Sequence, residues 1–529
     1  MINKRRRTLI GFVFVSVGVL LALLFGQSIF QSFTQGTNSL VEFARTTASA
    51  DNPIAAENNN SGTISWQVVR GKMATTQIQA YVGMRSVAHG QTITFYVSTQ
   101  QAGTHYDIAI YRMGWYQGTG GRLMTTISAQ VGQSQGYYDP GTATLLDCGT
   151  CYQDPATGLL EARWQPSYTL TIPHEWTTGI YLVKFIDANG FQTYTSFVVT
   201  GNPTSTYIVV TPDTTYAAYN NWGGRSLYDY NSTTVRAAKV SLLRPSTQQY
   251  GSDQVLIFMA DAIHWLERKG YDLSYMSDID LHANAATLLK HKAYISLGHD
   301  EYWTKEMRDG VEYARDQGVS LAFLEANASY WQARLEPSAT GLPNQTVVSY
   351  KVGTTDHNLE NDPFYQQDNS RVTAQWRDPV VNRPENAMIG IMFSDLTHGQ
   401  HGFPWSLAPT AKNNQLLLHT SLQPGQSYGC GLVGYEWDKV FHNGATPAGL
   451  QILASSPTTN DQGVVDSSNT TVYIAPSHAM VFATGSVYWT AALDSYRFDA
   501  DPSCEHQPLV VAGMQELLAI VMAQLVSAR

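Results

Sequence analysis

The stretch "KAYISLGHDEYWTKEM", residues 292–307, decides how the rest of the sequence is interpreted. Its first half is typical of a buried strand, and apolar side chains recur at helical spacing from about 303 to 317. Three ionisable residues, His299, Asp300 and Glu301, stand between the two elements. A polar turn would explain them. An active site would explain them equally, because open α/β sheets bind ligands beyond the carboxyl ends of their strands.

Strands and helices alternate on both sides of this stretch, which predicts a parallel, doubly wound sheet. We assign residues 203–529 to this α/β domain, with a long irregular insertion or extra β layer at about 336–425. The expected strands are 206–211, 271–277, 292–298, 319–327, 469–476 and 479–489, and the expected helices are about 255–266, 281–290, 303–317 and 505–527.

The region before this domain has a different pattern. Short runs of alternating apolar and polar residues, such as "QTITFYVST" and "GIYLVKFID", are separated by Gly, Asn and Thr turns over residues 63–202. Seven such runs without a helical stretch between them predict a β-sandwich. The fold class expected for the chain is therefore α/β plus all-β.

The N-terminus predicts a membrane anchor. Four basic residues, 4–7, precede an apolar run from Leu9 to Phe25 that is interrupted only by Ser16. Such a run is close to the length that spans a bilayer, and the basic flank stays in the cytoplasm. We therefore expect a signal anchor at 1–30, a flexible linker at 31–62, and a single-pass cell-membrane protein with extracytoplasmic domains, or a secreted protein if the anchor is cleaved.

Composition and cysteine content narrow the possible partners. The net charge is −10 and no basic stripe is present, which argues against a nucleic-acid partner.

The four cysteines of an exported chain favour disulfides. If Cys148 bridges to Cys151, Cys430 is left to pair with Cys504. A zinc site at the close pair is the alternative, but no second ligand pair follows at zinc spacing.

Two kinds of nucleophilic catalysis are excluded at the predicted strand ends. No Cys lies between residues 152 and 429, and the "GHDE" turn contains no G-x-S-x-G serine motif. The remaining side chains are phenols, carboxylates, a carboxamide and an imidazole. Such a set suits a hard metal ion or a general acid/base pair.

Several motifs together resemble a known family. They include "YRMGWYQGTGGRLM", "AAYNNWGGRSLY", "GHDEYW" and "GYEWD", and the likeness extends over about 65–500. The chain resembles the large (beta) subunit of N,N-dimethylformamidase and its relatives. This resemblance implies a β-sandwich joined to an amidotransferase-like α/β domain. It also implies hydrolysis of a small amide, one ferric ion bound by two tyrosines and one glutamate, and a possible small subunit or homo-oligomer.

The resemblance assigns roles to six residues. The implied metal ligands are Tyr181, Tyr219 and Glu301, and the implied catalytic or orienting residues are His299, Asn327 and Glu436. Each has a simpler explanation. Tyr181 shares a strand face with apolar residues, as a core tyrosine would, and Glu301 could be a charge near a helix N-terminus. Tyr216 is a substitute for Tyr219 as the phenolate ligand.

Three functions follow from these residues. The first is a hydrolase of a small amide C–N bond that depends on one metal ion, Fe3+ by resemblance. The second is a non-catalytic, membrane-tethered surface protein that binds glycan or peptide. The third is a metal-free hydrolase that uses Glu301 and Glu436. The first requires that the oxygens of Tyr181, Tyr219 and Glu301 lie close together.

Overall fold

Residues 292–307 form two strands and the start of a helix. In the computed structural model β16 covers Ala293–Gly298, β17 covers Tyr302–Thr304 and α6 covers Lys305–Asp316. The helix begins slightly later than expected because Thr304 caps it, its hydroxyl accepting a hydrogen bond from the Met307 amide at 3.2 Å. The structure describes residues 52–201, 203–353, 358–398, 402–495 and 510–527, which belong to one compact unit, residues 50–529.

A seven-stranded sheet forms the centre of the α/β part, with the order β15–β13–β16–β18–β27–β26–β25. The pairs from β15 to β27 are parallel, whereas β26 is antiparallel to both of its neighbours. The predicted alternation of parallel strands and helices is therefore observed. The strands are β13 (Tyr207–Thr211), β15 (Leu273–Ser277), β18 (Ser320–Glu325), β25 (Gln451–Thr459), β26 (Val465–Ile474) and β27 (Met480–Ala483).

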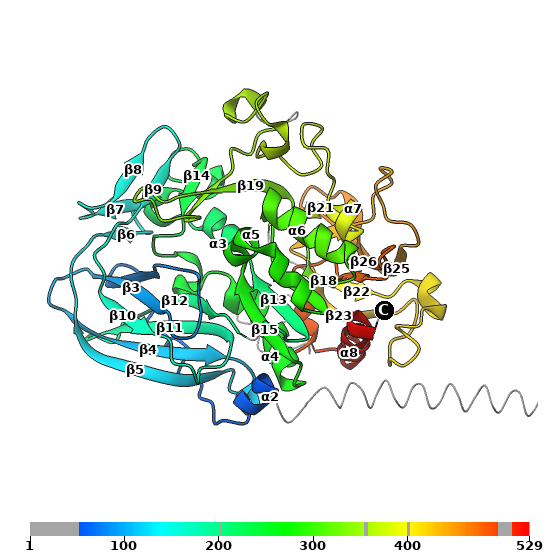
Figure 1. The fold of residues 1–529 in the computed structure, drawn as a ribbon, viewed down its shortest axis with the longest axis horizontal. Helices are drawn as coiled ribbons and strands as arrows, with labels where there is room; N and C mark the ends of the chain where they lie inside the picture. Colours follow the sequence, from blue (N-terminus) through cyan, green and yellow to red (C-terminus); the bar gives the residue numbers. More distant parts are fainter. Residues whose placement is uncertain (1–51, 202, 354–357, 399–401, 496–509, 528–529) are drawn as a thin grey trace, which may run out of the picture. The chain divides into compact units, whose positions relative to one another are not determined.

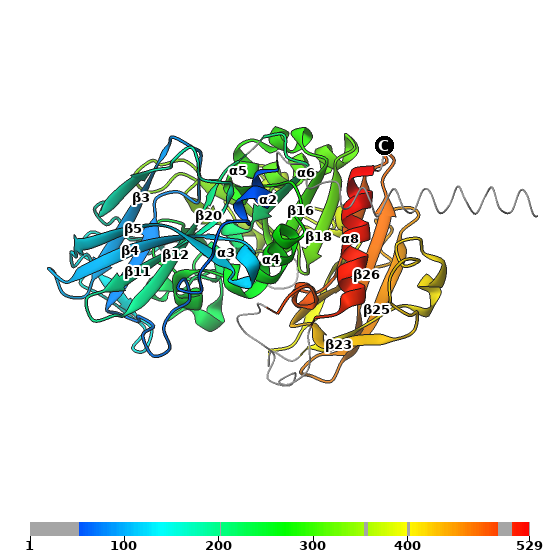
Figure 2. The same cartoon turned by 90° about the horizontal axis from the view of Figure 1, so that it is seen from below.

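Helices cover both faces of this sheet (Figures 1 and 2). Adjacent residues of β13 point to opposite faces, so Val209 packs in one apolar cluster with α4 and α8, whereas Val210 packs in another with α5 and α6. Burial on both faces explains why the strand is apolar throughout. The helices are α3 (Asp213–Tyr219), α4 (Ala260–Arg268), which a π-helical turn (Val255–Met259) precedes, α5 (Asp278–Ala283) and α8 (Ala512–Ser527).

Two sheets form the all-β part, drawn in blue to cyan in Figure 1, and all their strand pairs are antiparallel except β2 with β12. Their facing side chains share one apolar core, in which the rings of Phe95 and Phe185 lie 6.1 Å apart. One sheet contains β1 (Ile78–Val82), β3 (Thr92–Thr99) and β10 (Tyr168–Thr171). The other contains β2 (Ser86–Val87), β4 (His105–Met113), β5 (Gly121–Val131), β11 (Gly179–Asp187) and β12 (Gln192–Val199).

Smaller sheets surround the central one, and residues 336–425 consist largely of turns and short helices between them, as expected for an irregular insertion. The strands of the small sheets are β6 (Tyr137–Asp139), β7 (Thr144–Leu146), β8 (Tyr152–Asp154), β9 (Leu159–Glu161), β14 (Lys239–Ser241), β19 (Trp331–Glu336), β20 (Thr346–Val348), β21 (Met392–Leu396), β22 (Phe403–Ser406), β23 (Ser427–Val433) and β24 (Glu436–Lys439). A short helix, α7, covers Asn386–Ile389.

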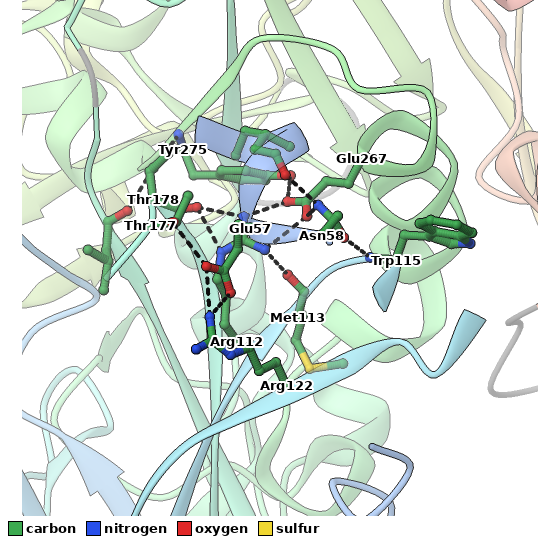
Figure 3. Close-up of polar contacts among 12 residues, drawn as sticks. Glu57, Asn58, Arg112, Met113, Trp115, Arg122, Thr177, Thr178, Glu267 and Tyr275 are labelled. Atoms are coloured by element: carbon green, nitrogen blue, oxygen red, sulfur yellow. Dashed lines mark hydrogen bonds and ion pairs between the residues drawn. The ribbon is translucent and has the colours of Figure 1, made fainter. Parts of the chain in front are cut away.

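The expectation of a flexible linker is wrong for residues 52–62. This segment contains α2 (Pro53–Glu57), whose Ile54 is fully buried. Asn52 caps the helix and also donates a hydrogen bond to the Gly270 carbonyl at 2.7 Å. Glu57 forms an ion pair with Arg122 at 2.8 Å (Figure 3). The polar composition and the lack of apolar periodicity had suggested a tether. Helix capping, the hydrogen bond to Gly270 and the ion pair with Arg122 instead hold the segment against the folded protein.

Two predictions concern covalent and membrane features. The disulfide between Cys148 and Cys151 is present. Cys430 is also disulfide-bonded, and its expected partner Cys504 lies outside the described residues. The predicted anchor at 1–30 lies outside them as well. Within the described part of the chain, no helix combines the length and apolar character needed to cross a bilayer.

Candidate active site

The candidate site begins where β16 ends. Gly298 adopts a left-handed conformation with φ of 91°, and a Cβ atom there would lie 3.1 Å from the Cβ of Phe258. Glycine therefore permits both the turn and the close approach of the neighbouring helical turn. The chain then places His299 and Glu301 at the carboxyl end of a parallel strand, where the sequence predicted a site.

Two tyrosine hydroxyls converge on the Glu301 carboxylate. The Tyr219 hydroxyl donates to Oε2 at 2.6 Å, and the Tyr228 hydroxyl lies 2.9 Å from Oε1 and 2.8 Å from Oε2. The Tyr302 hydroxyl donates to the Tyr228 hydroxyl at 2.8 Å. Tyr219 comes from the end of α3 and Tyr228 from the loop that follows it, so oxygens from three separate segments meet at one point.

Electrostatics keep these phenols neutral while only protein surrounds them. Burial, reinforced by the adjacent Glu301 carboxylate, raises the pKa of Tyr219 and of Tyr228 well above the ordinary value. Burial also raises the pKa of Glu301. The carboxylate is thus held by neutral hydroxyl donors and has no arginine partner among the described residues.

A second group of polar side chains lies beside Glu301. His299 Nε2 is 3.0 Å from Glu436 Oε2 and 3.6 Å from Glu301 Oε2. Asn327 donates from Nδ2 to Glu436 Oε2 at 3.0 Å. Burial by itself lowers the pKa of His299, but the negative charge of Glu436 outweighs it and raises the pKa to about 9. His299 is therefore an imidazolium at neutral pH, paired with the Glu436 carboxylate.

A cavity of about 950 Å³ lies beside these groups. Glu301, Asn327 and Glu436 lie on its wall together with Tyr219 and Tyr228. Pockets of this size enclose small-molecule ligands and combine apolar walls with a few placed polar groups. The site thus has the room and the chemistry to hold an organic molecule against paired carboxylates.

Five of the six residues that the sequence singled out lie together here, and Tyr181 does not. The Tyr181 hydroxyl donates to the Thr177 carbonyl at 2.7 Å, and its ring stacks on Trp176 at 5.0 Å inside the β-sandwich core. The expectation that Tyr181 meets Glu301 is wrong, and the core-tyrosine interpretation is the correct one. Tyr228 occupies the position beside Glu301 instead.

Two residues of the site were missed. Tyr228 ends the "AAYNNWGGRSLY" motif, so its place in that motif was the available signal. The Lys351 ammonium lies 3.5 Å from the centre of the Tyr228 ring, and burial lowers the pKa of this lysine to about 7. Lys351 lies in the irregular region at 336–425, where the pattern gave no reason to select it.

The donor set decides which metal the site would suit. In the described part of the chain, no group of three or more His, Cys, Asp or Glu side chains is arranged to hold a metal ion. Tyrosine oxygens are outside that set. Here two phenols and one carboxylate already converge within hydrogen-bond distance, and such hard oxygen donors match a hard cation once the phenolic protons are lost. The residues present therefore fit an oxygen-ligated cation.

Comparison with known proteins identifies the class. The family described as N,N-dimethylformamidase beta subunit-like, C-terminal, matches residues 107–505. The chain belongs to this family. The N,N-dimethylformamidase beta subunit of Alcaligenes sp. is 23% identical over 346 residues, which cover 56% of this chain and 44% of that protein. The chain thus matches less than half the length of this relative.

Similarity to solved structures is weak. A superoxide reductase (neelaredoxin) from Ignicoccus hospitalis aligns with 9% identity and a TM-score of 0.14, covering 23% of this chain and 80% of that one. A cycloisomaltooligosaccharide glucanotransferase from Paenibacillus sp. aligns with 8% identity and a TM-score of 0.17, covering 49% of this chain and 57% of that one. TM-scores this low carry no argument about fold or function.

Proposed function

We propose that this protein is a metal-dependent hydrolase that cleaves the C–N bond of an amide. The observation that carries the proposal is the convergence of the Tyr219 and Tyr228 hydroxyls on Glu301, inside a cavity that also contains the Glu436 carboxylate. Membership of the dimethylformamidase-like family supports a hydrolase of this kind. The amidotransferase-like character of the α/β domain remains a prediction of the resemblance.

In this proposal Tyr219, Tyr228 and Glu301 hold a single ferric ion. Three anionic ligands balance the charge of a trivalent cation, which favours phenolates over the neutral phenols of the metal-free site. When bound, the ion supplies Lewis-acid polarisation of the amide carbonyl. This ligand set replaces the one expected from the sequence, because Tyr181 lies in the sandwich core.

The neighbouring side chains provide the proton transfers. Glu436 takes a proton from the water that attacks the amide carbon, and returns it to the nitrogen of the departing amine. The His299 imidazolium, 3.0 Å away, holds the Glu436 carboxylate in place through an ion pair. The Asn327 amide orients the same carboxylate through its 3.0 Å hydrogen bond.

Metal content and colour test the proposal directly. The full-length protein, reconstituted with ferric iron, is expected to contain one iron per chain, to show the visible absorption of iron–phenolate charge transfer, and to hydrolyse formamides and acetamides. Amine release measures the last property. A colourless, iron-free protein after reconstitution would end the proposal. Activity that persists in a chelator would favour the metal-free alternative with Glu301 and Glu436.

Location and assembly are separate proposals. The apolar run Leu9–Phe25 behind four basic residues supports a membrane anchor with extracytoplasmic domains. The full-length chain should then remain in the membrane fraction after alkaline washing, and a chain without residues 1–30 should not. The Alcaligenes relative is named a beta subunit, so we also propose that this chain assembles with a small subunit or with itself. Light scattering of the purified protein measures this.

A further inference from the structure

We propose that the substrate is an amide much larger than N,N-dimethylformamide, carrying a flat apolar group and a hydrogen-bond donor, and that Gln254 accepts a hydrogen bond from that donor. This inference rests on the proposed function and extends it to the class of substrate. Three features of the cavity support it: its volume, its aromatic lining, and one buried carboxamide oxygen that has no hydrogen-bond partner in the described part of the chain.

The volume sets the first limit. At about 950 Å³ the cavity lies near the upper end of the range that encloses drug-sized ligands. An amide with only methyl substituents would fill a small part of it and leave most apolar wall in contact with water. A ligand that covers those apolar walls removes them from water, and this burial adds a favourable hydrophobic term to its binding free energy that the small amide lacks.

Aromatic side chains form two walls that favour a flat group. Phe258, Tyr435 and Tyr488 form a cluster with ring centres 5.8–6.4 Å apart, and Phe258 also contacts the His299 ring at 6.2 Å. A second aromatic pair, Tyr330 and Phe393, also lines the cavity, with ring centres 5.1 Å apart. Rings of this kind bind planar apolar groups by stacking or edge contacts. The wall next to His299 places such a group beside the reacting amide.

Gln254 supplies the polar part of the argument. Its side chain lines the cavity and is 6% exposed, yet its Oε1 has no hydrogen-bond partner among the described residues. Gln248, which also lines the cavity, has a protein partner, because its Nε2 donates to the Tyr216 carbonyl at 2.9 Å. A buried acceptor without a partner is costly, so a donor on the ligand would restore the missing hydrogen bond.

The position of Gln254 indicates where the donor lies on the substrate. The Gln254 carbonyl accepts from the Phe258 amide at 3.0 Å, so the two residues stand one helical turn apart. Phe258 contacts the His299 ring, so Gln254 lies one turn along the chain from a residue that touches the reacting groups. The donor belongs on the far part of the substituent and not on the amide that is cleaved. A phenolic hydroxyl on an aryl-ethyl group has this arrangement.

Three formamides test the inference by calorimetric titration of the full-length, iron-reconstituted protein: N,N-dimethylformamide, the formamide of phenethylamine and the formamide of tyramine. Burial of the phenyl ring should lower the Kd at least about 30-fold relative to N,N-dimethylformamide. The added hydroxyl should lower it about tenfold more. Gln254→Met, which keeps the side-chain length, should remove only the second gain, and Gln462→Met, on the exposed surface, should remove neither.

The outcomes separate this inference from the proposed function. Equal Kd values for the three formamides would overturn the inference, as would a tyramine preference that survives Gln254→Met. The wild-type comparison decides the question of size even if that variant does not fold. Tyramine formamide that binds tightly but releases no amine would sustain the inference and refute the hydrolase. Hydrolysis of all three formamides with equal Kd values would refute the inference and sustain the hydrolase.

Discussion

Two buried glutamates, Glu267 and Glu301, show how the same side chain serves different purposes in one molecule. Both carboxylates are almost completely buried and both accept several hydrogen bonds. They differ in the charge of their partners, and that difference separates a structural ion pair from a candidate reactive site.

Glu267 lies in α4 and is held by a permanent cation (Figure 3). Arg112 of β4 binds it with two hydrogen bonds of 2.8 and 2.9 Å. Asn58 and Tyr275 each donate to it at 2.8 Å. The nearby carboxylate raises the pKa of Arg112 well above its usual value, although burial alone would lower it. No lone pair is left for a ligand, so this cluster joins the β-sandwich to α4 and does no chemistry.

Glu301 has only neutral hydroxyls at hydrogen-bond distance, and its nearest cationic group is His299 at 3.6 Å. A buried carboxylate without a bonded cation is destabilising by itself, and an added cation would relieve that cost. The comparison therefore predicts that changes at Glu301 affect function more than stability, and that changes around Glu267 do the reverse.

The largest effect is expected for Glu301→Gln. The glutamine keeps the size of the side chain but removes the charge, so we expect loss of iron binding and a fall in amide hydrolysis of at least about 1,000-fold, roughly 4 kcal/mol in the barrier. Metal analysis and amine release measure these losses, while the thermal midpoint should move by only a few degrees. A fully active Glu301→Gln protein would show that Glu301, like Glu267, has no functional role.

Arg112→Met should have the opposite profile. It leaves Glu267 buried without its cation, and breaking a buried pair in this way typically costs about 3–5 kcal/mol. Urea unfolding measures the loss of stability. The protein that remains folded should keep its iron and its activity per folded molecule, because Arg112 does not line the cavity. A loss of iron stoichiometry in folded Arg112→Met would show that the two glutamates are coupled.

The two tyrosines of the revised ligand set form a matched pair of variants. Tyr228→Phe should lower iron affinity at least about 100-fold and weaken the visible band, because it removes a proposed ligand. Tyr181→Phe should leave the spectrum unchanged and cost about 1 kcal/mol of stability, since it removes only the hydrogen bond to Thr177. The reverse result would restore the ligand set first expected from the sequence.

A smaller effect than for Arg112→Met is expected for Asn58→Ala, which removes the neutral donor to Glu267 and the acceptor of the Trp115 and Tyr116 amides, while Arg112 and Tyr275 still bind Glu267. A loss of about 1–2 kcal/mol in the free energy of unfolding is expected, with unchanged activity. Asn60→Ala, a change to a more exposed neighbour on the same segment, serves as the control and should cost less. Equal effects would indicate that helix capping, and not the glutamate cluster, determines how strongly this segment is bound.

Local sequence patterns were a good guide to the centre of the site. The strand-to-helix segment 292–307, the position of Glu301 at its turn and the Cys148–Cys151 bridge all depend on residues close in the chain. Spacing reports such features because a strand, a turn and a tight disulfide are determined over a few residues. The motif that contains Tyr219 likewise located one of the two phenols.

Tertiary structure decided which distant residues complete the site. Tyr228 reaches Glu301 across 73 positions, and Asn327 reaches Glu436 across 109. Tyr181 lies in β11, which is buried along almost its whole length, and burial cannot tell a core ring from a ligand. Residues 52–58 bind Arg122 and Glu267, and the apolar periodicity of the sequence does not predict these contacts either. A pattern of apolar residues indicates which faces of a strand or helix are buried. The partner of a buried polar group depends on how separate elements pack in three dimensions.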